Sequence, residues 1–127
     1  MSEKKTILII DDSNTNVVLL EAILSTKGFT TITALSVKEA LSLIKDRKPH
    51  LILLDLMMPE IDGFEFLEKV RSENQLSEVP VIVVSALTDE ENIMKSKKYG
   101  AIEFIKKPVD INSLVSTVES IFNNPSA

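Results

Sequence analysis

Carboxylates follow two of the most apolar runs in this sequence, at the points where those runs stop. Asp11 and Asp12 come directly after the aliphatic residues 7–10, and Asp55 comes directly after residues 51–54. An ionised carboxylate beside a buried segment is costly to desolvate unless a partner compensates its charge. These aspartates therefore need either a counterion or a chemical role.

Three aliphatic runs, residues 7–10, 51–54 and 81–84, do not alternate with polar residues. This pattern is typical of strands covered on both faces in a parallel sheet. Two weaker candidates, residues 30–35 and 103–106, are shorter or more polar, and we expect them nearer the sheet edges. Apolar residues with a helical period separate the strands. They are Val17, Leu20 and Leu24; Val37, Ala40, Leu41 and Ile44; Phe64, Leu67 and Val70; and Leu114, Val118 and Ile121.

Helix starts and stops are also marked in the sequence. Three pairs match the capping box or a looser version of it: Ser36 with Glu39, Thr88 with Glu91, and Asp62 with Glu65. Gly28 and Gly100 fall where helices should end, and we interpret them as C-cap glycines. Five strands alternate with five helices, the fourth helix over about residues 89–99. The pattern predicts an α/β fold, a doubly wound five-stranded parallel sheet with helices on both faces.

Functional groups in such folds gather at the carboxyl ends of the strands. The predicted strands end in Asp11 and Asp12, in Asp55, in Ser85, and in Lys106, Lys107 and Pro108. Taken singly, an Asp or Ser after a strand usually caps the next helix, and a Lys is usually solvated. Taken together, three converging carboxylates would repel one another. A hard cation such as Mg²⁺ would resolve this repulsion and keep open positions for phosphate oxygens.

This combination of side chains favours phosphoryl transfer to a carboxylate. A lysine on a neighbouring strand can hold a phosphoryl group as a point charge, and a serine hydroxyl can donate to it. One aspartate can then act as the nucleophile, because with an ordinary pKa of about 3.9 it is ionised without a general base. No catalytic histidine is needed, and we interpret His50, the single histidine, as a surface residue.

Composition limits the other possibilities. The 127 residues, 44% of them hydrophobic, suit one domain over residues 1–127. There is no cysteine, so we expect neither disulfides nor a thiolate metal site. A net charge of -5 argues against a direct nucleic-acid partner. No apolar run approaches the roughly 20 residues of a spanning helix, so we expect no membrane partner and a cytoplasmic protein.

The motifs, taken in order, resemble those of one family. They are the pair Asp11-Asp12, the stretch DLMMP at residues 55–59 followed by Asp62-Gly63, Ser85-Ala86, Gly100-Ala101 and Lys107-Pro108. Over about residues 5–122 the chain resembles a response-regulator receiver domain of two-component signalling, of the single-domain, chemotaxis-regulator-like kind. The resemblance implies a flavodoxin-like fold with strand order 2-1-3-4-5.

The resemblance also implies roles for the acidic residues. Asp55 would be phosphorylated, and Asp12, Asp55 and the backbone carbonyl of Met57 would bind Mg²⁺. Asp11 would assist through the water shell of the metal. In the family, side chains two residues after the phosphorylated Asp and two after the switch hydroxyl affect the lifetime of the phosphoryl group. Here these are the apolar Met57 and Leu87, so we expect slow autodephosphorylation.

Ser85 and Lys107 would contact the phosphoryl group. Alternation along a strand sends Lys106 and Lys107 to opposite faces, and the family motif selects the lysine directly before proline. In the family this Lys-Pro bond is often cis. Ser85 and Phe104 would be the switch positions. Tyr is the commoner residue at the second one, so a signal that rests on a tyrosine hydroxyl is not available here.

The implied function is Mg²⁺-dependent transfer of a phosphoryl group to Asp55 from a phosphohistidine of a sensor histidine kinase or phosphotransfer protein. Such a domain catalyses only its own phosphorylation and dephosphorylation. The fourth helix, fifth strand and fifth helix would contact a downstream target protein. Only NNPSA follows the last predicted helix, so we expect no effector domain, although a piece of a longer regulator would look the same.

Two other classes fit the architecture less well. A phosphatase with an aspartyl nucleophile would need a second Asp two residues after Asp55, where Met57 stands. A flavodoxin-type binder would place a cofactor phosphate beside DDSNTN, whose two negative charges would repel it without a metal. The chain has only three glycines and no glycine-rich phosphate loop.

Overall fold

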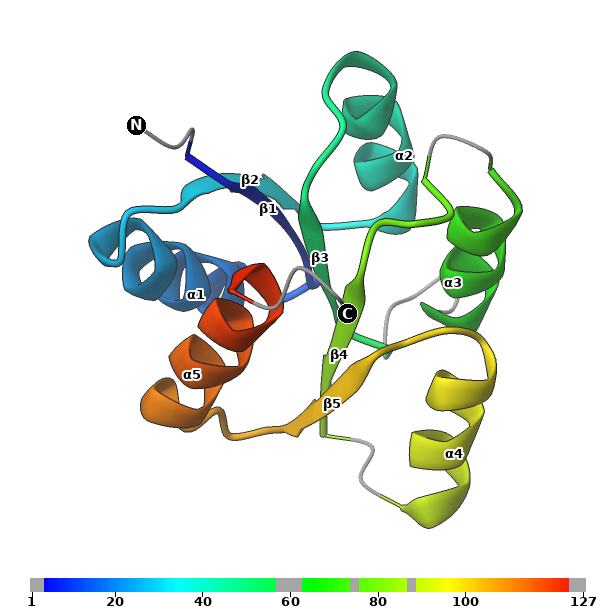
Figure 1. The fold of residues 1–127 in the computed structure, drawn as a ribbon. Coiled ribbons are helices and arrows are strands. Elements are labelled where there is room, and N and C mark those ends of the chain that lie inside the picture. The colour runs from blue at the N-terminus through cyan, green and yellow to red at the C-terminus, as the bar shows by residue number, and fades with distance from the viewer. Residues whose placement is uncertain (1–3, 57–62, 74–75, 87–88, 124–127) are drawn as a thin grey trace.

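A computed structural model describes residues 4–56, 63–73, 76–86 and 89–123. Within these residues, five strands alternate with five helices (Figure 1). They are β1 (Thr6–Ile10), α1 (Asn14–Thr26), β2 (Thr30–Ala34), α2 (Val37–Asp46), β3 (Leu51–Leu54), α3 (Gly63–Ser72), β4 (Val81–Ser85), α4 (Glu90–Lys98), β5 (Glu103–Lys106) and α5 (Ile111–Phe122). The strands form one parallel sheet in the order β2-β1-β3-β4-β5, which confirms the predicted flavodoxin-like fold.

The helices cover both faces of the sheet, with α1 and α5 on one face and α2, α3 and α4 on the other (Figure 1). Alternate strand residues therefore belong to different cores. Ile7 and Ile9 pack with the residues of α1 and α5, whereas Leu8 and Ile10 pack with those of α2 and α3. This two-sided burial explains why the central strands are continuous aliphatic runs in the sequence.

The two weaker strands occupy the sheet edges, as predicted, but three strand ends differ by one residue from the predicted ends. β1 starts at Thr6, which pairs in register with Thr30 of β2, and β4 runs through Ser85, which pairs with Lys106. β2 stops before Leu35, because the Leu35 N–H donates to the carboxylate of Glu39 at 2.7 Å instead of to a strand.

The marked helix ends are largely found where expected. The Ser36 hydroxyl accepts the Glu39 N–H at 3.1 Å, while the returning bond from Glu39 reaches Leu35 rather than the N-cap residue itself. Gly28 and Gly100 have φ of +93° and +104°, the left-handed conformation of a C-cap glycine. Asp62 and Thr88 lie outside the described residues, and the N-cap of α4 is Asp89.

The exposed His50 forms two hydrogen bonds with the first residue of β1. Its Nδ1 accepts the Thr6 N–H at 2.9 Å, and its own N–H donates to the Thr6 carbonyl at 2.8 Å. This contact lies at the amino-terminal edge of the sheet, away from the strand ends that carry the aspartates. His50 is thus a structural surface residue, in line with the sequence interpretation.

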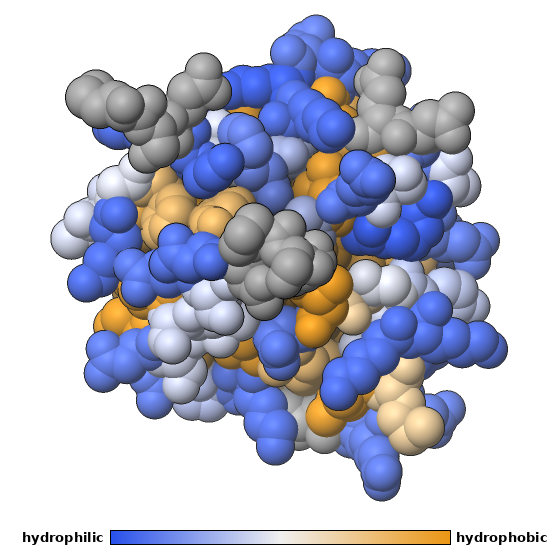
Figure 2. All heavy atoms as spheres, viewed as in Figure 1, coloured by the Kyte–Doolittle hydropathy of each residue, from blue (hydrophilic) through white to orange (hydrophobic). Residues whose placement is uncertain are grey.

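Polar and charged residues predominate on the face shown in Figure 2, and apolar residues appear there only as separated patches between the helices. Within the described part of the chain, no helix combines the length and the apolar character that crossing a bilayer requires.

Gly63 sets how closely α3 approaches the end of β3. A Cβ atom at this position would lie 2.8 Å from the Leu56 Cα and 3.1 Å from the Asp55 carbonyl oxygen. Both of these atoms belong to the backbone, so neither can move aside as a flexible side chain would. Glycine at this position is therefore required by close approach rather than by an unusual φ.

We expect Gly63→Ala to lower the free energy of unfolding by about 1–3 kcal/mol, because the added methyl group overpacks a backbone contact. Urea titration measures this change. Ser42→Ala is the control, since Ser42 is an exposed residue of α2 and the change introduces no new contact. If Gly63→Ala unfolds at the same urea concentration as wild type, a small shift of α3 relieves the contact and the prediction is wrong.

Candidate functional site

The predicted site residues come together at the carboxyl-terminal ends of the strands, where backbone hydrogen bonds continue just past the last strand residues. The Asp55 N–H donates to the Ile10 carbonyl at 2.9 Å, and the Asp11 N–H donates to the last carbonyl of β2 at 3.2 Å. The Lys107 N–H donates to the Ser85 carbonyl at 3.0 Å. The parallel pairing thus continues for one more residue, so the side chains of neighbouring strands emerge side by side.

Three carboxylates converge at this edge. Asp11, Asp12 and Asp55 each offer an oxygen within 4.8 Å of the other two. Asp11 and Asp55 are only 2% and 5% exposed, whereas Asp12 faces solvent. Oxygen-only ligands at this spacing fit a hard cation such as Mg²⁺, and the exposed side at Asp12 leaves room for water or phosphate oxygens.

Lys107 brings a positive charge to this cluster. Its Nζ donates to the Asp11 Oδ2 at 2.7 Å and to the Asp55 Oδ2 at 3.2 Å. Lys106 is exposed, so the structure separates the two lysines in the way that strand alternation suggests. The peptide bond between Lys107 and Pro108 is cis.

The pKa of Lys107 reflects opposing effects of its surroundings. Burial lowers this pKa, but the hydrogen bond to Asp11 and the charges of Asp55 and Asp11 raise it by more, so the net shift is upward. The lysine therefore stays protonated at neutral pH. Its contribution to the free energy of unfolding is complete below the unfolded-state pKa of about 10.4, and it is lost as the pH rises through the higher folded-state pKa.

Two residues that the sequence interpretation did not single out hold Asp11 in place. The Ser13 N–H donates to the Asp11 Oδ1 at 2.9 Å, and the Asn16 Nδ2 donates to the Asp11 Oδ2 at 3.4 Å. Ser13 also caps α1 by accepting the Asn16 N–H at 3.3 Å. An aspartate two residues before a helix-capping serine is an Asx-turn signal, which could have revealed this support.

The predicted switch residues lie on neighbouring strands. Ser85 is fully buried at the end of β4. Phe104 in β5 is half-buried and packs against the core formed with α2 and α3. These positions agree with the expected locations, while the switching role itself stays a prediction. Met57, the predicted backbone ligand of the metal, lies outside the described residues. So does Leu87, which is predicted together with Met57 to affect the lifetime of the phosphoryl group.

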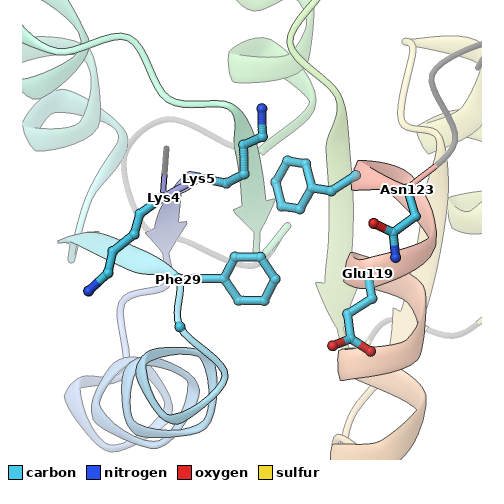
Figure 3. A pocket seen from close by; sticks show the side chains of 7 residues that line it. Lys4, Lys5, Phe29, Glu119 and Asn123 are labelled. Atoms are coloured by element: carbon cyan, nitrogen blue, oxygen red, sulfur yellow. The ribbon is translucent and has the colours of Figure 1, made fainter. Parts of the chain in front are cut away.

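A cavity lies near the amino-terminal ends of the strands, opposite to the aspartates (Figure 3). It has a volume of about 380 Å³ and is lined by Lys4, Lys5, Gly28, Phe29, Glu119, Phe122 and Asn123. The rings of Phe29 and Phe122 pair with each other, their centroids 5.5 Å apart. None of the three converging aspartates lines it, so this cavity is separate from the carboxylate cluster.

A smaller cavity of about 160 Å³ adjoins the carboxylate cluster. Its lining residues come from α1 and from the segment after β5: Asn16, Leu19, Leu20, Lys107, Pro108 and Val109. Lys107 belongs to both the cavity and the cluster, so a molecule seated against α1 would be next to the lysine that contacts Asp55.

Residues 7–119 match the family of response regulator receiver domains. The probable transcriptional regulator ycf27 of Porphyridium aerugineum is 37% identical over 119 residues. That alignment covers 94% of this chain and 48% of the relative, so the chain spans about half the length of that protein. PilH of Pseudomonas aeruginosa is 31% identical over 115 residues, which cover 91% of this chain and 95% of PilH.

The fold is similar to that of a chemotaxis protein of known structure. CheY4 of Vibrio cholerae superimposes with a TM-score of 0.89 at 27% identity, over 94% of this chain and 99% of CheY4. The family match covers most of the chain. The chain therefore belongs to the response regulator receiver domain family, whose members are signalling domains of two-component systems and not conventional enzymes.

Proposed function

We propose that this chain works in the cytoplasm as a phosphoacceptor, receiving a phosphoryl group on Asp55 from a phosphohistidine of a sensor histidine kinase or phosphotransfer protein. One observation carries the proposal. The Asp55 Oδ2 is 3.2 Å from the Lys107 Nζ, inside a cluster where Asp11, Asp12 and Asp55 approach within 4.8 Å. Here a buried carboxylate lies beside a fixed cation and two further acidic groups. This arrangement is better explained by a phosphoryl acceptor than by a purely structural ion pair.

The chemistry follows from these neighbours. A carboxylate oxygen of Asp55 attacks the phosphorus, the P–N bond breaks, and its electron pair stays on the imidazole nitrogen of the donor. Lys107 offsets the negative charge of the phosphoryl oxygens, while Asp11 orients Lys107 through the 2.7 Å contact. Asp11, Asp12 and Asp55 would hold Mg²⁺, which when bound supplies further positive charge beside the phosphoryl group. The same site would catalyse the later hydrolysis.

The output of the proposed switch is a change in the surface formed by α4, β5 and α5, which would contact a downstream target protein. A phosphoryl group adds a charge of about -1.5 to -2 close to Ser85. Its attraction for the Ser85 hydroxyl would move that segment, and Phe104 would follow into the vacated space. The positions of Ser85 at the end of β4 and Phe104 on β5 support this role.

A donor protein has an apolar surface to approach beside the site. Leu19 of α1 is 49% exposed and lines the small cavity next to Lys107. Exposed apolar side chains bordering a reactive group suit contact with a protein better than contact with a small ion. We therefore expect Leu19 to contribute to recognition of a protein donor and not to the chemistry.

Treatment with acetyl phosphate and Mg²⁺ should add one phosphoryl group to the wild-type chain, as measured by mass spectrometry. The added mass should be absent in Asp55→Asn and should be lost from wild type when EDTA removes the metal. Asp46→Asn, which changes an exposed aspartate of α2, is the control and should be labelled normally. Labelling of Asp55→Asn at another residue would exclude Asp55 as the acceptor.

Mg²⁺ should stabilise the wild-type fold through Asp12 even without a phosphoryl group, although binding is expected to be weak. The gain in the free energy of unfolding would be about 2.7 kcal/mol at a Mg²⁺ concentration 100 times the dissociation constant. Asp12→Ala should gain far less, and in EDTA it should be slightly more stable than wild type because one repelling charge is gone. Urea titrations in EDTA and in Mg²⁺ measure both effects, and an equal gain in both proteins would remove Asp12 from the ligands.

Leu19→Glu should slow phosphorylation by a phosphohistidine protein by about tenfold while leaving the rate with acetyl phosphate unchanged, because the loss of one central apolar contact costs more than about 1 kcal/mol. Ile102→Glu is the matched control and should not slow either reaction. Ile102 is 48% exposed and precedes β5, at the end of the strands opposite to the aspartates. Time courses with both donors test the two variants. Equal rates with the protein donor would contradict a role of Leu19 in docking.

A further inference from the structure

Helix α4 lies on the sheet with very little apolar burial of its own. Ser96 is its single buried residue, and the Ser96 hydroxyl donates to the Ile93 carbonyl of the same helix at 2.8 Å. Neither of its long apolar side chains is fully buried, since Ile93 is half-buried and Met94 is 63% exposed. An element with so few buried contacts opens at a low free-energy cost. The position of α4 must therefore depend on contacts made at its side and its end.

Phe64 in the first turn of α3 makes such contacts. The Lys95 Nζ lies over the Phe64 ring, 4.3 Å from its centroid. The Tyr99 ring, at the end of α4, is tilted by 43° to the Phe64 ring with the centroids 6.1 Å apart. These distances are within the usual range for a cation over an aromatic ring and for an aromatic pair. We call Phe64, Lys95 and Tyr99 the aromatic latch.

The latch is connected to the acceptor aspartate through backbone contacts. The Gly63 N–H donates to the Leu56 carbonyl at 3.3 Å, and the missing Cβ of Gly63 lets α3 sit directly against Leu56 and the Asp55 carbonyl. Leu56 is itself buried. A displacement of the backbone at residues 55–56 therefore moves Gly63, and with it the ring of Phe64.

We propose that the aromatic latch holds α4 in its unphosphorylated position and transmits the phosphorylation state of Asp55 to α4. This inference rests on the proposed function, because Asp55 must be the acceptor. The path runs from Asp55 and Leu56 through Gly63 to Phe64 and then to α4. It uses the α3 side of the helix and is separate from the Ser85 and Phe104 switch. A phosphoryl group on Asp55 displaces its backbone, the latch loosens, and α4 becomes free to take a second position.

Amide hydrogen exchange in residues 90–98 tests the latch before phosphorylation. Lys95→Gln removes the charge above the ring and keeps a good helix former, so these amides should exchange about two- to fivefold faster. Phe64→Leu also removes the ring contact with Tyr99 and should act at least as strongly, and the double variant should exceed Phe64→Leu by little, because that variant already lacks the contact with Lys95. Lys98→Gln is the matched control, since it removes the same charge from the same last turn. Exchange in β1 should stay unchanged in all variants.

The same variants are then compared after treatment with acetyl phosphate and Mg²⁺, with the added mass measured on each sample. In wild type, phosphorylation should speed exchange in α4, and in Lys95→Gln the further increase should be smaller because the latch is already open. If Lys95→Gln behaves like Lys98→Gln, or if the increase on phosphorylation is undiminished, the latch is not in the path. If the wild-type chain takes up no phosphoryl group, the proposed function is wrong, and so is the proposed transmission of the phosphorylation state to α4.

Discussion

The contact of Lys107 with Asp11 and Asp55 is the interaction on which the acidic edge of the sheet depends. Two nearly buried carboxylates and a third exposed one meet there, and the Lys107 Nζ bridges the two buried ones at 2.7 and 3.2 Å. Breaking a buried ion pair by removing one partner typically costs about 3–5 kcal/mol, because the remaining charge is left uncompensated. One lysine cannot balance three carboxylates, which leaves the cluster suited to a further cation and to a ligand with several oxygens.

The rest of the fold divides into a rigid support and a more loosely held helix. The central strands are buried on both faces, and the neighbouring backbones carry the aspartates and the lysine to the same edge. Helix α4 differs, because it buries only Ser96 and has side contacts with Phe64. Such a division suits a signalling domain, since the reactive groups need fixed geometry whereas the output surface has to move at a low free-energy cost.

Much of this architecture is predictable because it follows from local patterns. Continuous aliphatic runs identify the central strands, and the strand ends place Asp55 and Ser85 at the same end of the sheet. β2 is one residue shorter than predicted because the Glu39 carboxylate accepts the Leu35 N–H, whereas β1 and β4 are one residue longer because Thr6 and Ser85 continue the pairing with the neighbouring strands. The charges of DDSNTN do not indicate that Asn16 supports Asp11, because this contact depends on the geometry of the turn.

The helices, the strands, the position of the weaker strands at the sheet edges and the polar residues at the strand ends can all be predicted from the sequence, because they depend on periodicity over a few positions. Which atoms meet depends instead on how distant segments pack. Lys107 and Asp11 are 96 positions apart, and Lys107 and Asp55 are 52 apart, so their contacts exist only once β1, β3, β4 and β5 are aligned. The ring of Phe64 under Lys95 is likewise a product of packing between two helices, because no local pattern places a side chain of α3 against α4.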